Sequence, residues 1–298
     1  MRTSRFLARV EDADDDRKSA NPGRYMALTV VALFLASIPS QEVHGQDSKG
    51  AVDVSKPKLT DLYQDRTITF TGGEYKNETI HYRLMSPEVV EPGKTYPLVI
   101  FLHGAGERGT DNELQLLYFP TQMAEEKWRK KYPCFILAPQ CRPERKWMEV
   151  DWASPNDPVT PEEVSEQSLA VEQMIQKTLK EEPVDRSRVY LTGLSMGGFG
   201  SFDLGARHPE WFAAVAPICG AADPKKMAAL KNVPVYIVHG DSDTVVPVER
   251  SRSAVRALKE AGANPVYKEL PGVGHNSWTP GYSDEEGLVP WMFKQKKQ

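Results

Sequence analysis

One stretch of the chain reads Val189-Tyr-Leu-Thr-Gly-Leu-Ser195-Met-Gly-Gly-Phe199. Its first residues are mainly apolar, which predicts a buried strand, and residues 199–207 have the spacing of a helix. A serine between two glycines, after a strand and before a helix, is typical of a nucleophile elbow, a tight turn that exposes the hydroxyl. Gly-x-Ser-x-Gly also occurs by chance in glycine-rich turns, so the flanking elements carry the inference. We expect Ser195 to be a nucleophile.

Short apolar runs alternate with helical patterns on both sides of this stretch. The runs expected to form buried strands are 97–102, 134–138, 189–192, 213–218 and 233–238, with 266–270 as a more polar edge strand. The helical patterns cover 161–181, 199–207 and 248–261. Residues 67–71 and 79–84 flank Gly72-Gly73 and predict an antiparallel hairpin. This order predicts an α/β fold with a mainly parallel, doubly wound sheet and an N-terminal antiparallel hairpin.

Two connections between the predicted strands are informative. The segment between the strands that end at Ile218 and begin at Val233 has room for one short helix at 224–231, so we expect no separate lid domain. Residues 140–160 form the longest irregular stretch. Loops of this length are usually functional or disordered.

A serine hydroxyl needs a base to act as a nucleophile near neutral pH. Of the six histidines, only His275 lies in a glycine-rich loop after the last predicted strand, so we expect it to be the base. The others fall in the N-terminal segment, in the hairpin, at a helix end, or before a glycine at a strand end where they support turns: His44, His81, His208, His103 and His239.

The acid that orients the base is expected between Ser195 and His275 in the chain. Asp243 lies at the end of a predicted strand, in the sequence His239-Gly-Asp-Ser-Asp243. Asp241 is the alternative, because aspartates in a turn often only cap the local backbone. The order serine, acid, histidine at successive strand ends favours a carboxylate that fixes the imidazole tautomer.

Two backbone N–H groups are candidates for an oxyanion hole. Met196 follows the serine at the start of the predicted helix, and Ala105 lies in the loop after the strand at 97–102. The side chains expected to line the substrate site are Trp147, Trp152, Trp278 and Arg108. Each tryptophan alone is more often a packing residue, and a charged loop tip is equally often held by its own ion pairs, so both alternatives stay open.

The net charge of −4 leaves no basic excess, which argues against nucleic acid as a partner. No glycine-rich phosphate loop precedes a predicted helix, which argues against a nucleotide-binding enzyme. Cys134, Cys141 and Cys219 lack metal-ligand spacing, so we expect no metal. We expect all three cysteines to be free and buried, with a Cys141–Cys219 bridge as the alternative.

The first residues carry the features of a targeting signal. An uncharged apolar run at 26–39 follows Arg24, and small residues precede Gln46. We expect residues 1–45 to be a leader and signal peptide, 46–60 a flexible linker and 61–298 the catalytic domain. The protein would then be secreted or periplasmic, with no stable membrane partner. An uncleaved anchor is the alternative, and Met26 competes with Met1 as the start.

Four motifs occur in order: Leu102-His-Gly-Ala-Gly-Glu-Arg-Gly109, Gly193-Leu-Ser-Met-Gly-Gly198, His239-Gly-Asp-Ser-Asp243 and Gly274-His-Asn-Ser-Trp278. Over residues 60–297 the chain resembles the α/β-hydrolase superfamily. More narrowly, it is similar to secreted bacterial carboxylesterases related to feruloyl and acetylxylan esterases and to polyhydroxybutyrate depolymerases, some of whose relatives are labelled predicted peptidases.

The resemblance implies ester hydrolysis without a cofactor, through an acyl-enzyme. It also favours Asp243 over Asp241, because the acid of the superfamily usually stands three residues after the glycine of His-Gly. The similar dienelactone hydrolases use cysteine where this chain has Ser195, which puts that activity in doubt. The expected partner is an ester substrate, small or linked to a polysaccharide. The alternatives are a serine peptidase of the prolyl-oligopeptidase-like group and a non-catalytic binding protein on the same fold.

Overall fold

The computed structural model describes residues 58–152, 154 and 156–297. The expected leader and signal peptide at 1–45, and the expected linker up to residue 57, lie outside these residues. Within the described part of the chain, no helix is both long enough and apolar enough to cross a bilayer.

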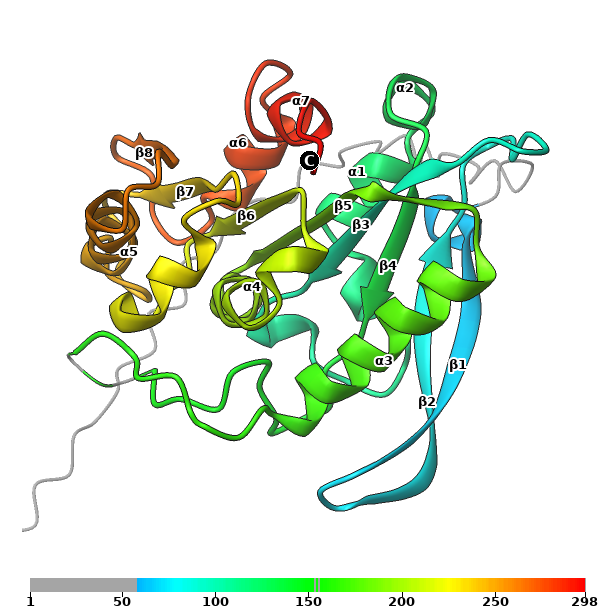
Figure 1. The fold of residues 1–298 in the computed structure, drawn as a ribbon, viewed down its shortest axis with the longest axis horizontal. Helices are drawn as coiled ribbons and strands as arrows, with labels where there is room; N and C mark the ends of the chain where they lie inside the picture. Colours follow the sequence, from blue (N-terminus) through cyan, green and yellow to red (C-terminus); the bar gives the residue numbers. More distant parts are fainter. Residues whose placement is uncertain (1–57, 153, 155, 298) are drawn as a thin grey trace, which may run out of the picture. The chain divides into compact units, whose positions relative to one another are not determined.

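An eight-stranded sheet forms the centre of the domain (Figure 1). In chain order the strands are β1 Tyr63–Gly72, β2 Tyr75–Met85, β3 Tyr96–Leu102, β4 Phe135–Pro139, β5 Val184–Leu194, β6 Ala214–Ile218, β7 Tyr236–Gly240 and β8 Val266–Leu270. Their order across the sheet is β1-β2-β4-β3-β5-β6-β7-β8. β2 pairs antiparallel with β1 and β4, and all other neighbours are parallel. The predicted hairpin, mainly parallel sheet and C-terminal edge strand are confirmed.

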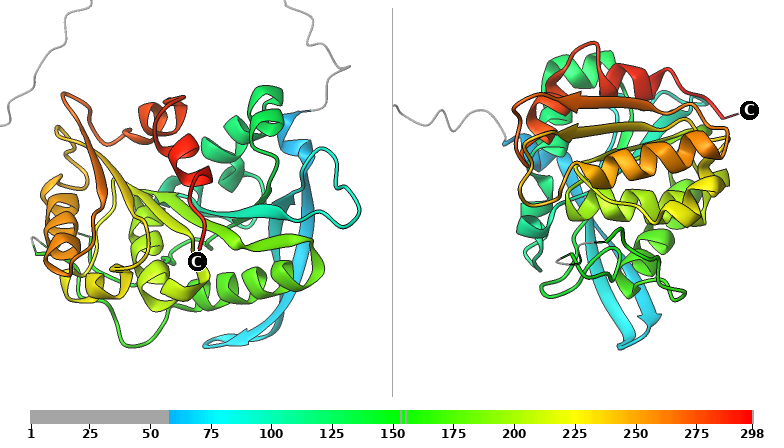
Figure 2. Two further views of the ribbon diagram at one scale, coloured as in Figure 1. Left: turned by 45° about the horizontal axis from the view of Figure 1, so that its top comes forward. Right: turned by 90° about the vertical axis from the view of Figure 1, so that its left-hand side faces the viewer.

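Helices cover both faces of the sheet, as the edge-on view in Figure 2 shows. One face carries α3 Glu166–Glu181, α4 Met196–Arg207 and α5 Glu249–Glu260, and the other carries α1 Phe119–Ala124, α2 Glu126–Lys131, α6 Trp278–Ser283 and α7 Leu288–Phe293. Short 3₁₀ helices are η1 Leu59–Leu62, η2 Ala105–Glu107, η3 Leu114–Leu116, η4 Pro209–Trp211 and η5 Pro224–Leu230.

The core is divided by the sheet into two layers. Along β3, Leu98 and Ile100 pack against the layer under α3 and α4, whereas Val99 and Phe101 pack against the layer under α1 and α6. Successive side chains of a strand point to opposite faces, so a strand covered by helices on both faces must be apolar throughout. All seven residues of β3 are buried, which explains the unbroken apolar run in the sequence.

Several predicted boundaries differ from the observed ones. α3 begins at Glu166 rather than at residue 161, because the hydroxyl of Ser165 caps the helix by accepting from the N–H of Ser168. α4 begins directly after Ser195, three residues before the apolar pattern shows. β7 begins at Tyr236 rather than at Val233. Between β6 and β7 the chain forms only η5, as predicted for a domain without a lid at that point.

Candidate active site

Three polar side chains expected to act together meet at one edge of the sheet. Ser195 lies between β5 and α4, Asp243 follows β7, and His275 lies in the loop between β8 and α6. These strands are parallel, so their carboxyl ends reach the same edge, where α/β proteins bind their ligands. The Oγ atom of Ser195 is 2.9 Å from Nε2 of His275, and Nδ1 of His275 is 2.7 Å from Oδ2 of Asp243.

The turn at Ser195 is strained and closely packed. Its backbone has a φ of 52° and a ψ of −118°, a conformation that non-glycine residues rarely adopt. The flanking glycines permit this turn. A Cβ on Gly197 would lie 1.8 Å from the carbonyl oxygen of Leu102, and one on Gly193 would lie 2.5 Å from the carbonyl oxygen of Gly197. The predicted elbow is therefore present, and a side chain at either glycine would clash with the backbone of β3 or of the start of α4.

Asp243 is held as a buried anion. Its Oδ1 atom accepts from the backbone N–H groups of Val245 at 2.8 Å and Val246 at 2.9 Å. Burial opposes ionisation, but hydrogen bonds from His239, His275 and these two N–H groups outweigh it and hold the pKa of Asp243 well below its ordinary value. The carboxylate can therefore accept from Nδ1–H of His275, which leaves Nε2 as the acceptor for the serine proton.

The runner-up aspartate has a different environment. Asp241 is exposed, and its carboxylate accepts from the hydroxyl of Ser242 and from the N–H of Gly272. It connects the loop after β7 to the loop after β8, and these hydrogen bonds go to Ser242 and Gly272 rather than to His275. The geometry supports Asp243 in the orienting position.

A further histidine contacts the same carboxylate. His239 is fully buried, with Nε2 3.1 Å from Oδ2 of Asp243 and 2.8 Å from the carbonyl oxygen of Val246. The expectation that it only supports a turn is incomplete. Its position four residues before Asp243 is the one sequence signal for this contact, and that spacing does not show which way the ring faces. His103 does support a turn: its Nδ1 lies 2.6 Å from the carbonyl oxygen of Gly104, its Nε2 accepts from the N–H of Cys141 at 2.9 Å, and burial lowers its pKa to about 4.

The loop after β3 passes beside the serine. A Cβ on Gly104 would lie 3.6 Å from Cβ of Ser195, and Ala105 begins η2 directly afterwards. The guanidinium of Arg108 donates to the carbonyl oxygen of Ala105 at 2.9 Å. Glu107 folds back over Gly104, and burial raises the pKa of its carboxyl. Arg108 therefore holds the loop after β3 in place, apart from any role in substrate binding.

The predicted aromatic wall is only partly present at the site. Trp147 is 1% exposed, and its indole N–H donates to the carbonyl oxygen of His103 at 3.0 Å. The expectation that Trp147 lines the substrate site is therefore corrected, because its ring is part of the core. Trp278 lies beside the base, with its ring centroid 5.4 Å from that of His275. Trp152 is 36% exposed and lies over Phe199 of α4, at a centroid distance of 6.5 Å.

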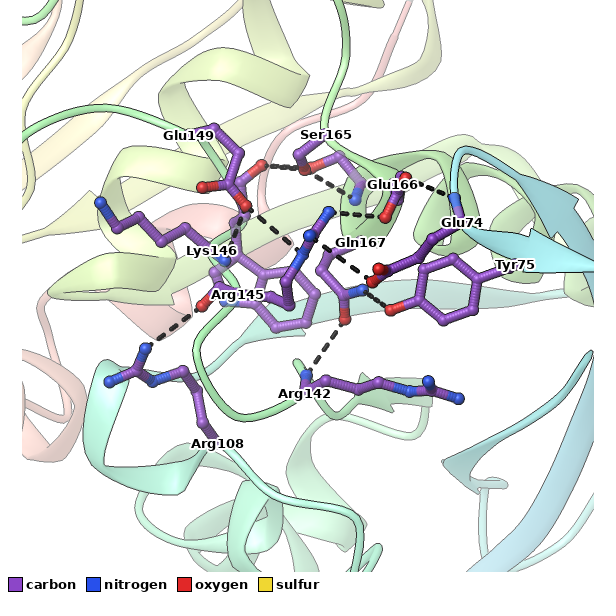
Figure 3. A network of polar contacts seen from close by, with 12 residues as sticks. Glu74, Tyr75, Arg108, Arg142, Arg145, Lys146, Glu149, Ser165, Glu166 and Gln167 are labelled. Carbon is purple, nitrogen blue, oxygen red and sulfur yellow. Dashed lines mark hydrogen bonds and ion pairs between the residues drawn. The ribbon is translucent and has the colours of Figure 1, made fainter.

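The long loop from residue 140 to 160 is anchored by ion pairs and hydrogen bonds (Figure 3). Arg145 contacts Glu166 of α3 at 2.5 Å and Glu74 of the hairpin at 3.5 Å. The side-chain amide of Gln167 donates to the hydroxyl of Tyr75 at 2.7 Å. The first half of this loop is thus held between the hairpin and α3, and it leads to Trp152.

The three cysteines are free and buried, as predicted, and no Cys141–Cys219 bridge is formed. The Sγ atom of Cys219 lies within 4.8 Å of ligand atoms of Asp243 and His275. Burial raises the pKa of the Cys219 thiol to about 12, which keeps it protonated in this environment. Nδ1 of His275 is hydrogen-bonded to Asp243 and Nε2 to Ser195, so these donors fit a hydrogen-bonded triad better than a metal site.

The model of the phospholipase/carboxylesterase family matches residues 85–284. A crystal structure of a thermostable esterase is 38% identical, with a TM-score of 0.72, and the match covers 80% of this chain and 64% of that one. A probable inactive carboxylesterase of Oryza sativa subsp. japonica is 27% identical over 194 residues, 60% of this chain and 77% of that protein.

A bifunctional acetylxylan esterase/xylanase of Neocallimastix patriciarum is 37% identical over 90 residues, 30% of this chain and 13% of that protein. The family match covers more than half of the chain, and the sheet order agrees with the structural similarity. The chain therefore belongs to the phospholipase/carboxylesterase family, a family of carboxylic ester hydrolases with the α/β-hydrolase fold.

Proposed function

We propose that this chain is a serine carboxylesterase that hydrolyses carboxylic esters through an acyl-enzyme. The observation that carries the proposal is the continuous hydrogen-bonded chain from Ser195 through His275 to Asp243, with distances of 2.9 and 2.7 Å. A hydroxyl in contact with an imidazole that is itself oriented by a buried carboxylate is the arrangement that activates serine.

In the first half-reaction, Oγ of Ser195 bonds to the ester carbonyl carbon while its proton moves to Nε2 of His275. The carbonyl oxygen gains the negative charge. We assign the stabilisation of this oxyanion to the N–H groups of Met196 and Ala105, because each residue begins a helix and the first N–H groups of a helix have no intrahelical acceptor. The carbon–oxygen bond of the ester then breaks, and His275 returns the proton to the departing alcohol.

In the second half-reaction, water attacks the acyl-enzyme. His275 takes a proton from the water as its oxygen bonds to the acyl carbon. The bond to Oγ then breaks, the serine regains its proton from His275, and the carboxylic acid leaves. Asp243 stays ionised and stabilises the imidazolium in both halves.

The proposed substrates are esters on plant polysaccharide. A domain with only η5 between β6 and β7 leaves room for a bulky substrate at the serine edge. Trp278 lies beside His275, and the exposed Trp152 packs over Phe199 of α4. Aromatic faces of this kind suit sugars and phenolic acyl groups. The similarity to an acetylxylan esterase/xylanase supports this choice. Export through the predicted signal peptide at 1–45 would bring the enzyme to such substrates.

The test compares wild type with Ser195→Ala on 4-nitrophenyl acetate, followed by methyl ferulate, acetylated xylan and a peptide 4-nitroanilide. We expect the alanine variant to lose activity by at least about a thousandfold. We expect wild type to release acetate from xylan or ferulate from its ester faster than it cleaves the anilide. Cleavage of the anilide alone would replace the esterase proposal with a peptidase, and an inert wild type would favour a binding protein.

A further inference from the structure

Two imidazoles contact the carboxylate of Asp243, and the triad uses only one of them. His275 approaches Oδ2 at 2.7 Å from the loop after β8, and His239 approaches the same oxygen at 3.1 Å from β7. The side chains of His239 and Asp243 are both 0% exposed. Water therefore cannot take the place of the His239–Asp243 contact. A buried polar group that loses its partner destabilises the fold.

The ring of His239 has one orientation that satisfies its neighbours. Nε2 faces two acceptors, Oδ2 of Asp243 and the carbonyl oxygen of Val246 at 2.8 Å, so this nitrogen carries a proton. Nδ1 lies 2.6 Å from the hydroxyl of Ser251 in α5. Ser251 is itself 0% exposed. A helix on one face of the sheet thus fixes the ring that touches the acid.

The two oxygens of the Asp243 carboxylate have different kinds of hydrogen-bond donor. Oδ1 is held by the rigid backbone N–H groups of Val245 and Val246, whereas Oδ2 has only side-chain donors. Cys219 lies close to the acid as well, with Sγ within 4.8 Å, but as a protonated thiol it is a weak donor. Without His239, Oδ2 would keep His275 as its one strong donor and could tilt away from the position in which it aligns that ring.

We propose that His239 is a positioning residue for the esterase reaction, which holds Oδ2 of Asp243 in line with His275, and that Ser251 holds His239 in turn. The inference rests on the proposed serine mechanism. It adds a fourth and a fifth residue to the triad, and it places one of them on α5, outside the loops that carry the reacting groups.

The test uses His239→Leu and His239→Gln. Leucine fills a similar volume without a donor, whereas glutamine can present an N–H near the position of Nε2. We expect His239→Leu to lower kcat by about tenfold, roughly the contribution of one hydrogen bond to a charged group, with little change in KM. We expect His239→Gln to recover at least half of that loss on the logarithmic scale.

The pH profile separates positioning from packing. An Oδ2 atom that is no longer held in line with His275 stabilises the protonated ring less. The acid limb of kcat/KM should therefore move to lower pH in His239→Leu and stay near the wild-type position in His239→Gln. Ser251→Ala should also lower kcat, as His239→Leu does. Ser253→Ala is its control, because Ser253 lies on the same helix, is buried and bonds Asp157 instead.

Equal loss of activity in the leucine and glutamine variants, with unshifted profiles and lowered unfolding midpoints, would reduce His239 to a packing residue and overturn the proposal. Unchanged kcat in both variants would overturn it too. A failure of the serine mechanism is recognised separately, because Ser195→Ala would then keep its activity.

Discussion

Ser195 has a backbone conformation that costs of the order of 1–3 kcal/mol for a residue with a side chain. The φ of 52° persists because the surroundings determine it: the N–H of Ser195 donates to the carbonyl oxygen of Ile218 at 3.0 Å, and α4 begins at the next residue. The strain places the hydroxyl at the end of β5, within reach of His275. Rigid neighbours thus fix the position of one reactive oxygen.

The choice between the two aspartates can be tested by exchanging each carboxylate for an amide. We expect Asp243→Asn to lower kcat by roughly a thousandfold or more, because an amide can hold the imidazole in the wrong tautomer. Asp241→Asn is the matched control. This variant keeps a side-chain oxygen that can accept from the N–H of Gly272 and the hydroxyl of Ser242, so it loses only an exposed charge and should stay within about threefold of wild type. Steady-state kinetics of both variants decides, and a larger loss in Asp241→Asn would reverse the assignment.

At the scale of the elements, the site depends on how closely α4 approaches β3. The carbonyl oxygen of Leu102 occupies the space that a Cβ on Gly197 would need, at a distance of 1.8 Å. Backbone atoms cannot move aside as a flexible side chain can. The first turn of α4 can therefore carry only glycine at this position if the serine is to stay where it is.

We expect Gly197→Ala to destabilise the protein by more than about 2 kcal/mol, through overpacking against backbone. Gly106→Ala serves as the control, because a Cβ there meets no atom within 4 Å. It should change stability by less than about 0.5 kcal/mol. Urea unfolding measures both. Equal effects of the two substitutions would contradict the claim that position 197 needs glycine because α4 lies so close to β3.

The sequence was sufficient for the elements that follow a strong periodic pattern. Strands buried on both faces read as apolar runs, and the elbow reads as Gly-x-Ser-x-Gly between a strand and a helix. The start of α3 was missed because Pro161-Glu-Glu is a good local helix start, whereas Ser165 takes the capping position through tertiary contacts.

The side chains of the site were harder to assign than its elements. Trp147 and Trp152 lie five residues apart in one irregular loop, yet the first is in the core and the second is at the surface. No periodic pattern distinguishes them, since the loop is placed by Arg145 contacts to Glu166 and Glu74. His239 was identifiable as a strand-end residue, but its contact with Asp243 depends on the packing of α5.

At the scale of the whole molecule, several carboxylates couple folding to pH. Hydrogen bonds from Arg252 and Tyr267 lower the pKa of Glu269 to about 2. Burial opposes the ionisation of Asp185, but bonds from Ser187 and Arg188 outweigh it and lower its pKa to about 2. A group whose pKa is lower in the folded state stabilises the fold above its unfolded pKa, about 4 for these residues, and loses that contribution as pH falls through the folded value.

We therefore expect Glu269→Gln to reduce the free energy of unfolding at pH 7, and the difference from wild type to shrink as pH falls from 5 to 2. Glu269 connects β8 to α5 through Arg252, so the effect reports on the edge of the sheet that carries His275. Urea unfolding at a series of pH values provides the measurement. A difference that stays constant down to pH 2 would mean that the charge of Glu269 contributes nothing to stability.

The central claim is that Ser195 is the nucleophile of an ester hydrolase. Its most direct test is to treat wild type and Ser195→Ala with a fluorophosphonate, then to measure the intact mass and map the modified peptide. We predict one adduct per chain, located on Ser195, with loss of esterase activity in proportion to labelling and no adduct in the alanine variant. Labelling of another residue, or equal labelling of both proteins, would contradict the account.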